Sequence, residues 1–201
     1  GGGNDSITGV DGADSLIGDD GNDSISGGGG ADTILGGNNN DTLFGDTGAD
    51  SIEGGNGTDS ILGGADDDTI LGGDAADTLL GGDGNDSIDG GSDNDSLFGG
   101  NENDTLTGGD GHDTLVLGNG NGIFSGGAGN DSFLLSHANQ IGPIGAGGIN
   151  SVVGGSGTDS LVFTAVVSIG DGQLVNVSGV EVIQAASSTG NTIRIGVHAQ
   201  A

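Results

Sequence analysis

Cysteine, methionine, tryptophan and tyrosine are absent from this sequence of 201 residues, and basic residues are nearly absent. Without cysteine, the chain can form neither a disulfide framework nor a thiolate metal site. Arg194 is its one Lys or Arg and stands against 30 acidic residues, so the formal net charge is -29. Such a charge repels nucleic acid and anionic membrane surfaces and attracts cations. We therefore expect cations as partners and no nucleic acid.

Aromatic residues make up 2% of the chain, and proline occurs once. No hydrophobic run is long enough to span a bilayer, so we expect no membrane insertion. No basic and then apolar leader is found at Gly1, so we expect any export signal to lie outside these residues.

Motifs of common hydrolases are also missing. Neither H-E-x-x-H nor G-x-S-x-G occurs in the sequence. The three histidines, His112, His137 and His198, do not have the spacing of metal ligands. We predict that the chain is not an enzyme, and that a hydrolase would need a separate catalytic domain.

The chain is rich in glycine, with 50 residues, and one aspartate recurs in it every nine residues. The frame is clearest at residues 81–89, which read G-G-x-G-x-D-x-U-x with U a large aliphatic residue. We number these positions one to nine, so that the aspartate is at the sixth. The eighth position is aliphatic in every unit from Ile7 to Leu115. Acidic chains with few aromatics are often disordered, but disorder does not require this regular aliphatic residue.

The nine positions divide into a turn and a strand. The first six are mostly glycine, aspartate and asparagine, which tolerate tight turns, and we expect the last three to form the strand. Alternation then points the eighth side chain inward and the seventh and ninth outward. Two units make one coil of turn, strand, turn and strand. The sequence predicts an all-β fold, a right-handed parallel β-roll (β-solenoid) with two nonapeptides per coil.

Alternate units lie on opposite sides of such a roll, so the aspartates form two ladders. The odd ladder contains Asp5, Asp23, Asp41, Asp59, Asp77, Asp95, Asp113 and Asp131, and the even ladder contains Asp14, Asp32, Asp50, Asp68, Asp86 and Asp104. Gly122 stands where the next even aspartate would be. Carboxylates stacked one coil apart repel by roughly 1 to 3 kcal/mol per pair. We expect a hard divalent cation between the turns to neutralise them, bound by carboxylate and carbonyl oxygens.

These features are similar to a known family. Residues 1–134 resemble the RTX nonapeptide β-roll of secreted bacterial proteins, over consecutive units in register. The resemblance implies Ca²⁺ in the turns, held by the aspartate and backbone carbonyls of turns one coil apart. The resemblance thus implies that all the ladder aspartates and Asp159 are metal ligands, and that they bind roughly 12 calcium ions in all. Without calcium we expect the chain to be disordered.

Two glycine positions depart from the consensus. The fourth is occupied by Asn39, Asp66, Ala75, Asp93 and Glu102, and the second by Val10, Asp19 and Asp46. If the fourth position needs a backbone conformation that only glycine adopts easily, these turns are strained or altered. We expect weaker metal sites there.

The nine-residue period stops at Leu135. Residues 154–161 restore one unit, but Asp159 lies 28 residues after Asp131, which leaves its ladder membership open. We predict strands at 161–169, 173–177 and 180–184, and divide the chain into a regular roll (1–134) and modified coils that continue or cap it (135–201). Because the repeat is interrupted at both ends of the sequence, we also expect these residues to be part of a longer repetitive protein.

An outward stripe of apolar residues occupies the ninth position of the odd units. It contains Phe44, Leu62, Leu80, Phe98, Val116 and Leu134. The stripe is either a surface for self-association, lateral or end-to-end, or an ordinary ladder of bulky cross-strand neighbours. The sequence favours a secreted calcium-binding structural protein of a bacterial cell surface, in a surface layer, extracellular filament or adhesin. The alternative is the C-terminal folding and secretion module of an exported hydrolase or toxin.

Overall fold

The computed structural model describes residues 1–135, 151–163 and 177–185, and every regular element among them is a β-strand. The strands form two parallel sheets. The odd sheet has the order β1 (Ser6–Asp11), β3 (Ser24–Gly29), β5 (Thr42–Thr47), β7 (Ser60–Ala65), β9 (Thr78–Asp83), β11 (Ser96–Asn101), β13 (Thr114–Asn119), β15 (Ser132–Leu135), β17 (Ser160–Phe163), β19 (Val182–Ala185). The even sheet consists of β2 (Ser15–Asp20), β4 (Thr33–Asn38), β6 (Ser51–Asn56), β8 (Thr69–Asp74), β10 (Ser87–Ser92), β12 (Thr105–Asp110), β14 (Ile123–Ala128), β16 (Ser151–Ser156), β18 (Val177–Ser178).

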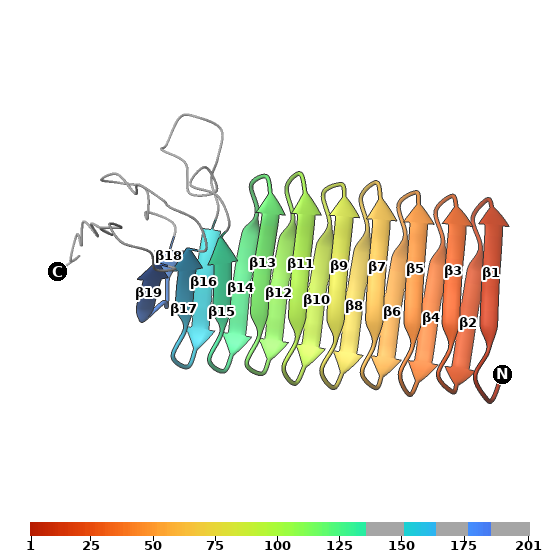
Figure 1. Ribbon diagram of the computed structural model, residues 1–201, viewed down its shortest axis with the longest axis horizontal. Helices are drawn as coiled ribbons and strands as arrows, with labels where there is room; N and C mark the ends of the chain where they lie inside the picture. Colours follow the sequence, from red (N-terminus) through yellow and green to blue (C-terminus); the bar gives the residue numbers. More distant parts are fainter. Residues whose placement is uncertain (136–150, 164–176, 186–201) are drawn as a thin grey trace.

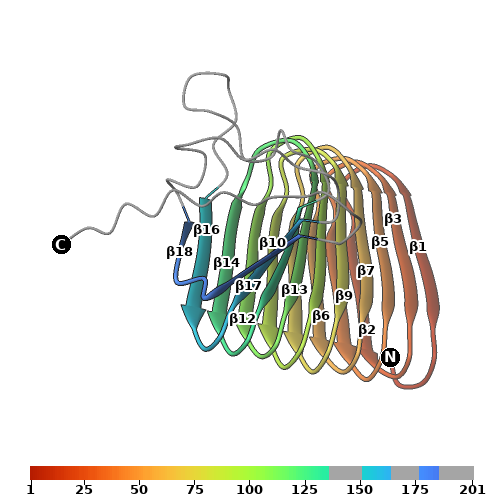
Figure 2. The same cartoon turned by 60° about the vertical axis from the view of Figure 1, so that its left-hand side comes forward.

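Strands eighteen residues apart in sequence are neighbours in each sheet. Ser6 pairs with Ser24 and Ile7 with Ile25, and the same register continues along the regular part of the roll. Figure 1 shows the strands side by side from the N-terminal end to the C-terminal end, and the turned view in Figure 2 shows the turns that join the two sheets. The predicted parallel β-solenoid, with two nonapeptides per coil, is confirmed.

The strands are longer than the sequence indicated. A strand over positions seven to nine was expected, but each regular strand has six residues and continues through the first three positions of the next unit, as in β10 (Ser87–Ser92). Only positions four to six are left for the turn. The prediction was wrong because glycine does not end these strands. Gly90 continues the alternation at a buried position where a Cβ would have no room.

The core is one aliphatic side chain per unit. The eighth-position residues from Ile25 to Leu115 are at most 2% exposed, so each coil buries two of them against the coils on either side. Phe124 and Phe133 take the same position further on and meet edge to face, with ring centroids 6.1 Å apart. Such a thin core buries little apolar surface per residue ordered. The stability of the roll therefore depends strongly on the interactions made in its turns.

The substituted glycine positions are strained as expected. At the fourth position Asn39, Asp66, Ala75, Asp93 and Glu102 have φ between 71° and 78°, and at the second Asp19 and Asp46 have 77° and 74°. Of the eight substituted residues only Val10 avoids a positive φ. Left-handed backbone costs roughly 1 to 2 kcal/mol for most residues with a Cβ and is adopted most readily by Asn and Asp. The expected need for a glycine-like backbone at the fourth position is thus confirmed.

Beyond Leu135 the described strands extend the same two sheets. β16 pairs with β14, and β17 with β15, although 28 residues separate the partners. The predicted strands at 164–169 and 173–176 lie outside the described residues, and the division of the chain at residue 134 stays a prediction. In the described ranges, no helix of a length and apolarity sufficient to cross a membrane is found.

Candidate metal sites

The sixth-position aspartates close each turn immediately before a strand begins. Thirteen of the fifteen predicted ligands are buried, at most 3% exposed: Asp23, Asp32, Asp41, Asp50, Asp59, Asp68, Asp77, Asp86, Asp95, Asp104, Asp113, Asp131 and Asp159. Asp5 and Asp14, in the first coil, are more exposed. Buried carboxylates are rare unless they are paired, so each of the thirteen requires partners.

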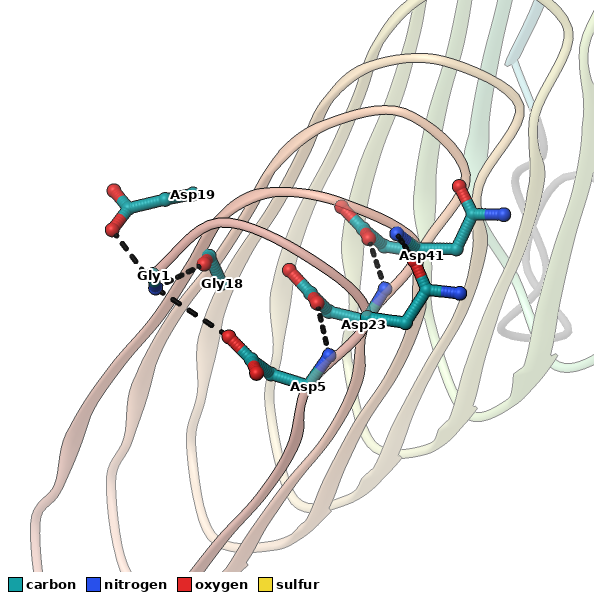
Figure 3. A network of polar contacts seen from close by, with 8 residues as sticks. Gly1, Asp5, Gly18, Asp19, Asp23 and Asp41 are labelled. Atoms are coloured by element: carbon teal, nitrogen blue, oxygen red, sulfur yellow. Dashed lines mark hydrogen bonds and ion pairs between the residues drawn. The ribbon is translucent and has the colours of Figure 1, made fainter.

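One oxygen of each buried carboxylate has a backbone partner. The N–H of Asp5 donates to Oδ1 of Asp23 at 2.7 Å, and the N–H of Asp23 donates to Oδ1 of Asp41 at 2.7 Å (Figure 3). The same bond links successive aspartates along both sides of the roll, and the two ladders have the predicted members. It also settles the open question of Asp159, because the N–H of Asp131 donates to Oδ1 of Asp159 at 2.8 Å. Asp159 therefore continues the odd ladder.

The second oxygen has no hydrogen-bond donor. In all thirteen buried aspartates, no group of the described ranges donates to Oδ2. In twelve of them, all but Asp104, this atom lies beside the first-position glycine of its own unit and a backbone carbonyl of the next coil. A Cβ built on Gly72 would stand 2.4 Å from Oδ2 of Asp77 and 2.6 Å from the carbonyl oxygen of Gly90. Two oxygens thus converge on one point that only glycine leaves open.

This donor set fits calcium. A buried carboxylate oxygen beside a carbonyl oxygen is costly unless a cation or a proton lies between them. Ca²⁺ accepts carboxylate and backbone carbonyl oxygens together at 2.3–2.6 Å. Within the residues described, no group of three or more His, Cys, Asp or Glu side chains could hold a metal. Each site would therefore combine at most two carboxylates with carbonyl oxygens, which favours Ca²⁺ over metals that need nitrogen or sulfur ligands.

A positive group lies against an equivalent pair of oxygens at the first coil. The ammonium of Gly1 donates to the carbonyl oxygen of Gly18 at 2.8 Å and lies 3.5 Å from Oδ2 of Asp5 (Figure 3). Gly18 is at the first position and Asp5 at the sixth, as in the pairs along the roll. Oδ2 of Asp19 also lies 3.2 Å from this ammonium. Oδ2 of Asp5 and the carbonyl oxygen of Gly18 thus lie close to one point, as the corresponding oxygen pairs do further along the roll.

Burial raises the pKa of the ladder carboxyls from Asp41 to Asp131. Desolvation is the largest cause, and it raises the pKa of Asp59 and Asp131 to about 6 and that of Asp77 to about 7. The pKa values of Asp68, Asp95 and Asp104 are also raised to about 7, again mainly by burial. The N–H bond to Oδ1 opposes this effect, and neighbouring carboxylates add to it. The sequence pointed to repulsion between stacked carboxylates, whereas loss of water raises their pKa more than repulsion does.

These pKa values predict that acid stabilises the metal-free roll. A folded-state pKa above the ordinary 3.8 means that the folded chain binds more protons than the unfolded chain between about pH 4 and 7. Each unit of raised pKa destabilises the folded state by about 1.4 kcal/mol per carboxyl at higher pH, and this penalty disappears as the pH falls. In excess chelator, far-UV circular dichroism should therefore show β-structure gained from pH 8 to pH 4. With calcium bound the direction reverses, because protons then compete with the cation.

The control for this titration is light scattering at each pH, which separates folding from precipitation near the pI of about 4.1. If metal-free chains that stay dispersed gain no β-structure on acidification, then the buried carboxyls do not destabilise the metal-free roll at higher pH.

A ladder of fifth-position side chains was missed in the sequence. The N–H of Asn22 donates to Oδ1 of Asn4 at 2.9 Å, and the N–H of Asn40 donates to Oδ1 of Asn22 at 3.1 Å. His112 takes the same place, with Nδ1 accepting from the N–H of Asn130 at 2.8 Å. The repeated Asn-Asp pairs were the available signal. The fifth position thus supplies a side-chain acceptor to many of the turns, including the carboxylate of Asp67, which accepts the N–H of Asn85 at 2.7 Å.

Comparison with known proteins agrees with this geometry. A family model of the RTX calcium-binding nonapeptide repeat (4 copies) matches residues 1–34, 35–70, 62–97, 71–106, 89–124 and 98–133. No curated protein matches the chain significantly. The matches together cover residues 1–133 of the 201, which is well over half of the chain. The chain belongs to the RTX calcium-binding nonapeptide repeat family.

Proposed function

We propose that this chain is a secreted calcium-binding structural protein without catalytic activity, which folds on meeting Ca²⁺ outside the cell. Its place would be in a bacterial surface layer, an extracellular filament or an adhesin. The observation that carries the proposal is the row of thirteen buried Oδ2 atoms, none with a donor in the described ranges. RTX repeats are typical of secreted proteins, which supports the extracellular location.

In this proposal the fifteen sixth-position aspartates are the calcium ligands, with carbonyl oxygens of the first-position glycines, for roughly 12 ions. Bound calcium supplies the positive charge that the buried carboxylates lack. The chain itself offers one Lys or Arg against 30 acidic residues. Extracellular modules bind calcium in the range of about 10⁻⁴ to 10⁻³ M, so the chain would stay unfolded at low cytoplasmic calcium and fold after export.

The apolar stripe on the odd sheet supports self-association. Leu62 and Leu80 are 37% exposed and Phe98 is 38% exposed, on consecutive strands of the odd sheet. Phe44, Val116 and Leu134 extend the stripe and are half-buried. A second copy of the chain, laid against this stripe or stacked on the end of the roll, is the partner we propose. An assembly of this kind suits a surface layer or filament better than a module that serves only an attached enzyme.

The test is a calcium titration of the purified chain, followed by far-UV circular dichroism and light scattering and then reversed with chelator. We expect a coil-to-β transition accompanied by growth of long particles. A transition in which the particles remain monomeric would favour the alternative, the folding and secretion module of an exported hydrolase or toxin. Absence of any transition would contradict calcium as the folding ligand.

A further inference from the structure

The segment Val177–Ala185 joins the roll although it lacks the nonapeptide. β18 pairs with β16 through Val152 and Val177, and β19 pairs with β17 through Ser160 and Val182. The N–H of Val182 donates to the carbonyl oxygen of Asp159 at 3.0 Å, as the seventh-position Ser160 does to Asp131 at 2.7 Å. Val182 therefore occupies a seventh position.

This register gives Gly179 and Glu181 defined places in the repeat. Glu181 precedes Val182 and so stands at the sixth position, where the other units of this ladder have aspartate. Gly179 follows Ser178, the partner of Val153, and so stands at the first position. A regular turn has five steps from the first to the sixth position, but here Gly179 and Glu181 are only two residues apart. The turn is shortened by three residues.

The longer side chain of glutamate matches the shortened turn. Oε2 of Glu181 accepts the N–H of Asp159 at 2.9 Å. This is the bond that Oδ1 of an aspartate makes in the other coils, for example between Asp131 and Asp159. Glutamate has one more methylene than aspartate, which lets its carboxylate reach the coil before it from a shorter loop. Glu181 thus completes the ladder despite the missing residues.

A carboxylate oxygen and a backbone carbonyl oxygen converge beneath this turn, as they do in the regular sites. A Cβ on Gly154 would stand 2.0 Å from the carbonyl oxygen of Gly179 and 2.4 Å from Oδ2 of Asp159. At Gly126 in the preceding coil, the corresponding distances are 2.6 Å to the carbonyl of Gly154 and 2.2 Å to Oδ2 of Asp131. Asp159 is fully buried, and no group in the described part of the chain donates to its Oδ2. The oxygen pair is therefore intact although the segment that supplies Gly179 is not a repeat.

We propose that a calcium ion held by Asp159 binds between this carboxylate and Gly179, outside the region that the family model matches, which ends at residue 133. Asp159 supplies a carboxylate oxygen, Gly179 supplies a carbonyl oxygen, and Glu181 is a positioning residue that holds the shortened turn over the site. The proposal rests on the calcium-binding function proposed above. Its consequence is that the segment Val177–Ala185 docks onto the roll only when calcium is bound.

The test compares wild type with Asp159→Asn, Glu181→Ala and the control Glu53→Gln, which removes an exposed carboxylate of the even sheet. Asparagine at 159 keeps the Oδ1 acceptor for the N–H of Asp131 but loses the charge on the second oxygen. Native mass spectrometry counts the bound calcium ions, and hydrogen exchange reports on the amide of Val182, whose acceptor belongs to Asp159.

In saturating calcium we expect D159N to bind one ion fewer than wild type and its Val182 amide to exchange at least about tenfold faster, which corresponds to a loss of about 1.4 kcal/mol. E181A should show faster exchange at Asp159 and Val182, and a higher calcium concentration should be needed to protect them. The control should match wild type, and amides in β7 to β13 should be unchanged in every variant.

A D159N chain that binds as many ions as wild type and protects Val182 equally would overturn the proposal. Wild type itself provides a second measurement that needs no variant to fold, since Val182 must lose its protection when calcium is removed by chelator. In chelator, protection of Val182 together with the amides of β7 to β13 overturns the calcium-dependent folding proposed above as well as this site, whereas a D159N chain that matches wild type in calcium overturns this site alone.

Discussion

Replacing Asp77 with asparagine is expected to stabilise the metal-free roll at neutral pH and to destabilise the calcium-loaded roll. Asparagine keeps the Oδ1 acceptor for the N–H of Asp59, a bond of 2.8 Å. It removes a carboxyl whose pKa burial raises to about 7. It also places an amide N–H₂ where Oδ2 lies near the carbonyl oxygen of Gly90. We expect a gain of about 2 to 4 kcal/mol without metal and a loss of about 2 kcal/mol with it.

Three quantities check this reversal. They are the β-signal in chelator, the calcium concentration at the folding midpoint, and the urea midpoint in saturating calcium. The matched control is Asp74→Asn, which makes the same charge change at an exposed third-position residue. The control should shift all three quantities only slightly. If D77N and D74N behave alike, the buried sixth-position carboxylate is not a metal ligand.

Gly81→Ala is expected to destabilise the calcium-loaded chain by about 3 kcal/mol and to remove one bound ion. Its Cβ would stand 2.1 Å from Oδ2 of Asp86 and 2.6 Å from the carbonyl oxygen of Gly99. Both distances are shorter than real Cβ contacts, and both atoms belong to the proposed site. Gly81 does not have a positive φ, so backbone strain does not explain the loss. The added methyl group occupies the space between the two oxygens.

The control for this substitution is Gly29→Ala at the third position, where φ is also not positive. There a Cβ would have ordinary contacts, 3.4 Å from Oγ1 of Thr47 and 3.5 Å from Oδ1 of Asp11. Urea unfolding in saturating calcium and the number of ions bound are measured for both variants. Equal stability of G81A and G29A, with equal ion counts, would show that the point beside Asp86 is not a cation site.

Much of the roll could be predicted because its repeat is local and regular. The aliphatic residue at every ninth position, from Ile7 to Leu115, has no explanation other than one inward side chain per unit. The strand length could not be read in the same way, because glycine disfavours strands in general. Gly90 lies within a strand because the neighbouring coil and the carboxylate of Asp95 leave no room for a Cβ. That exclusion involves atoms from different coils and has no signature in local propensity.

By itself the sequence determined the nine-residue period, the core position, the two aspartate ladders and the need for cations, since each follows from spacing and composition. Only the tertiary structure decided that one oxygen of each carboxylate accepts a backbone N–H while the other faces a carbonyl. It alone also placed Asp159 and Glu181 in the odd ladder, across spacings of 28 and 22 residues. The physical reason is that these contacts depend on how the coils stack and not on distance along the chain. An insertion or a shortened turn changes the spacing in the sequence, whereas the backbone register between the coils, and with it the contact, is preserved.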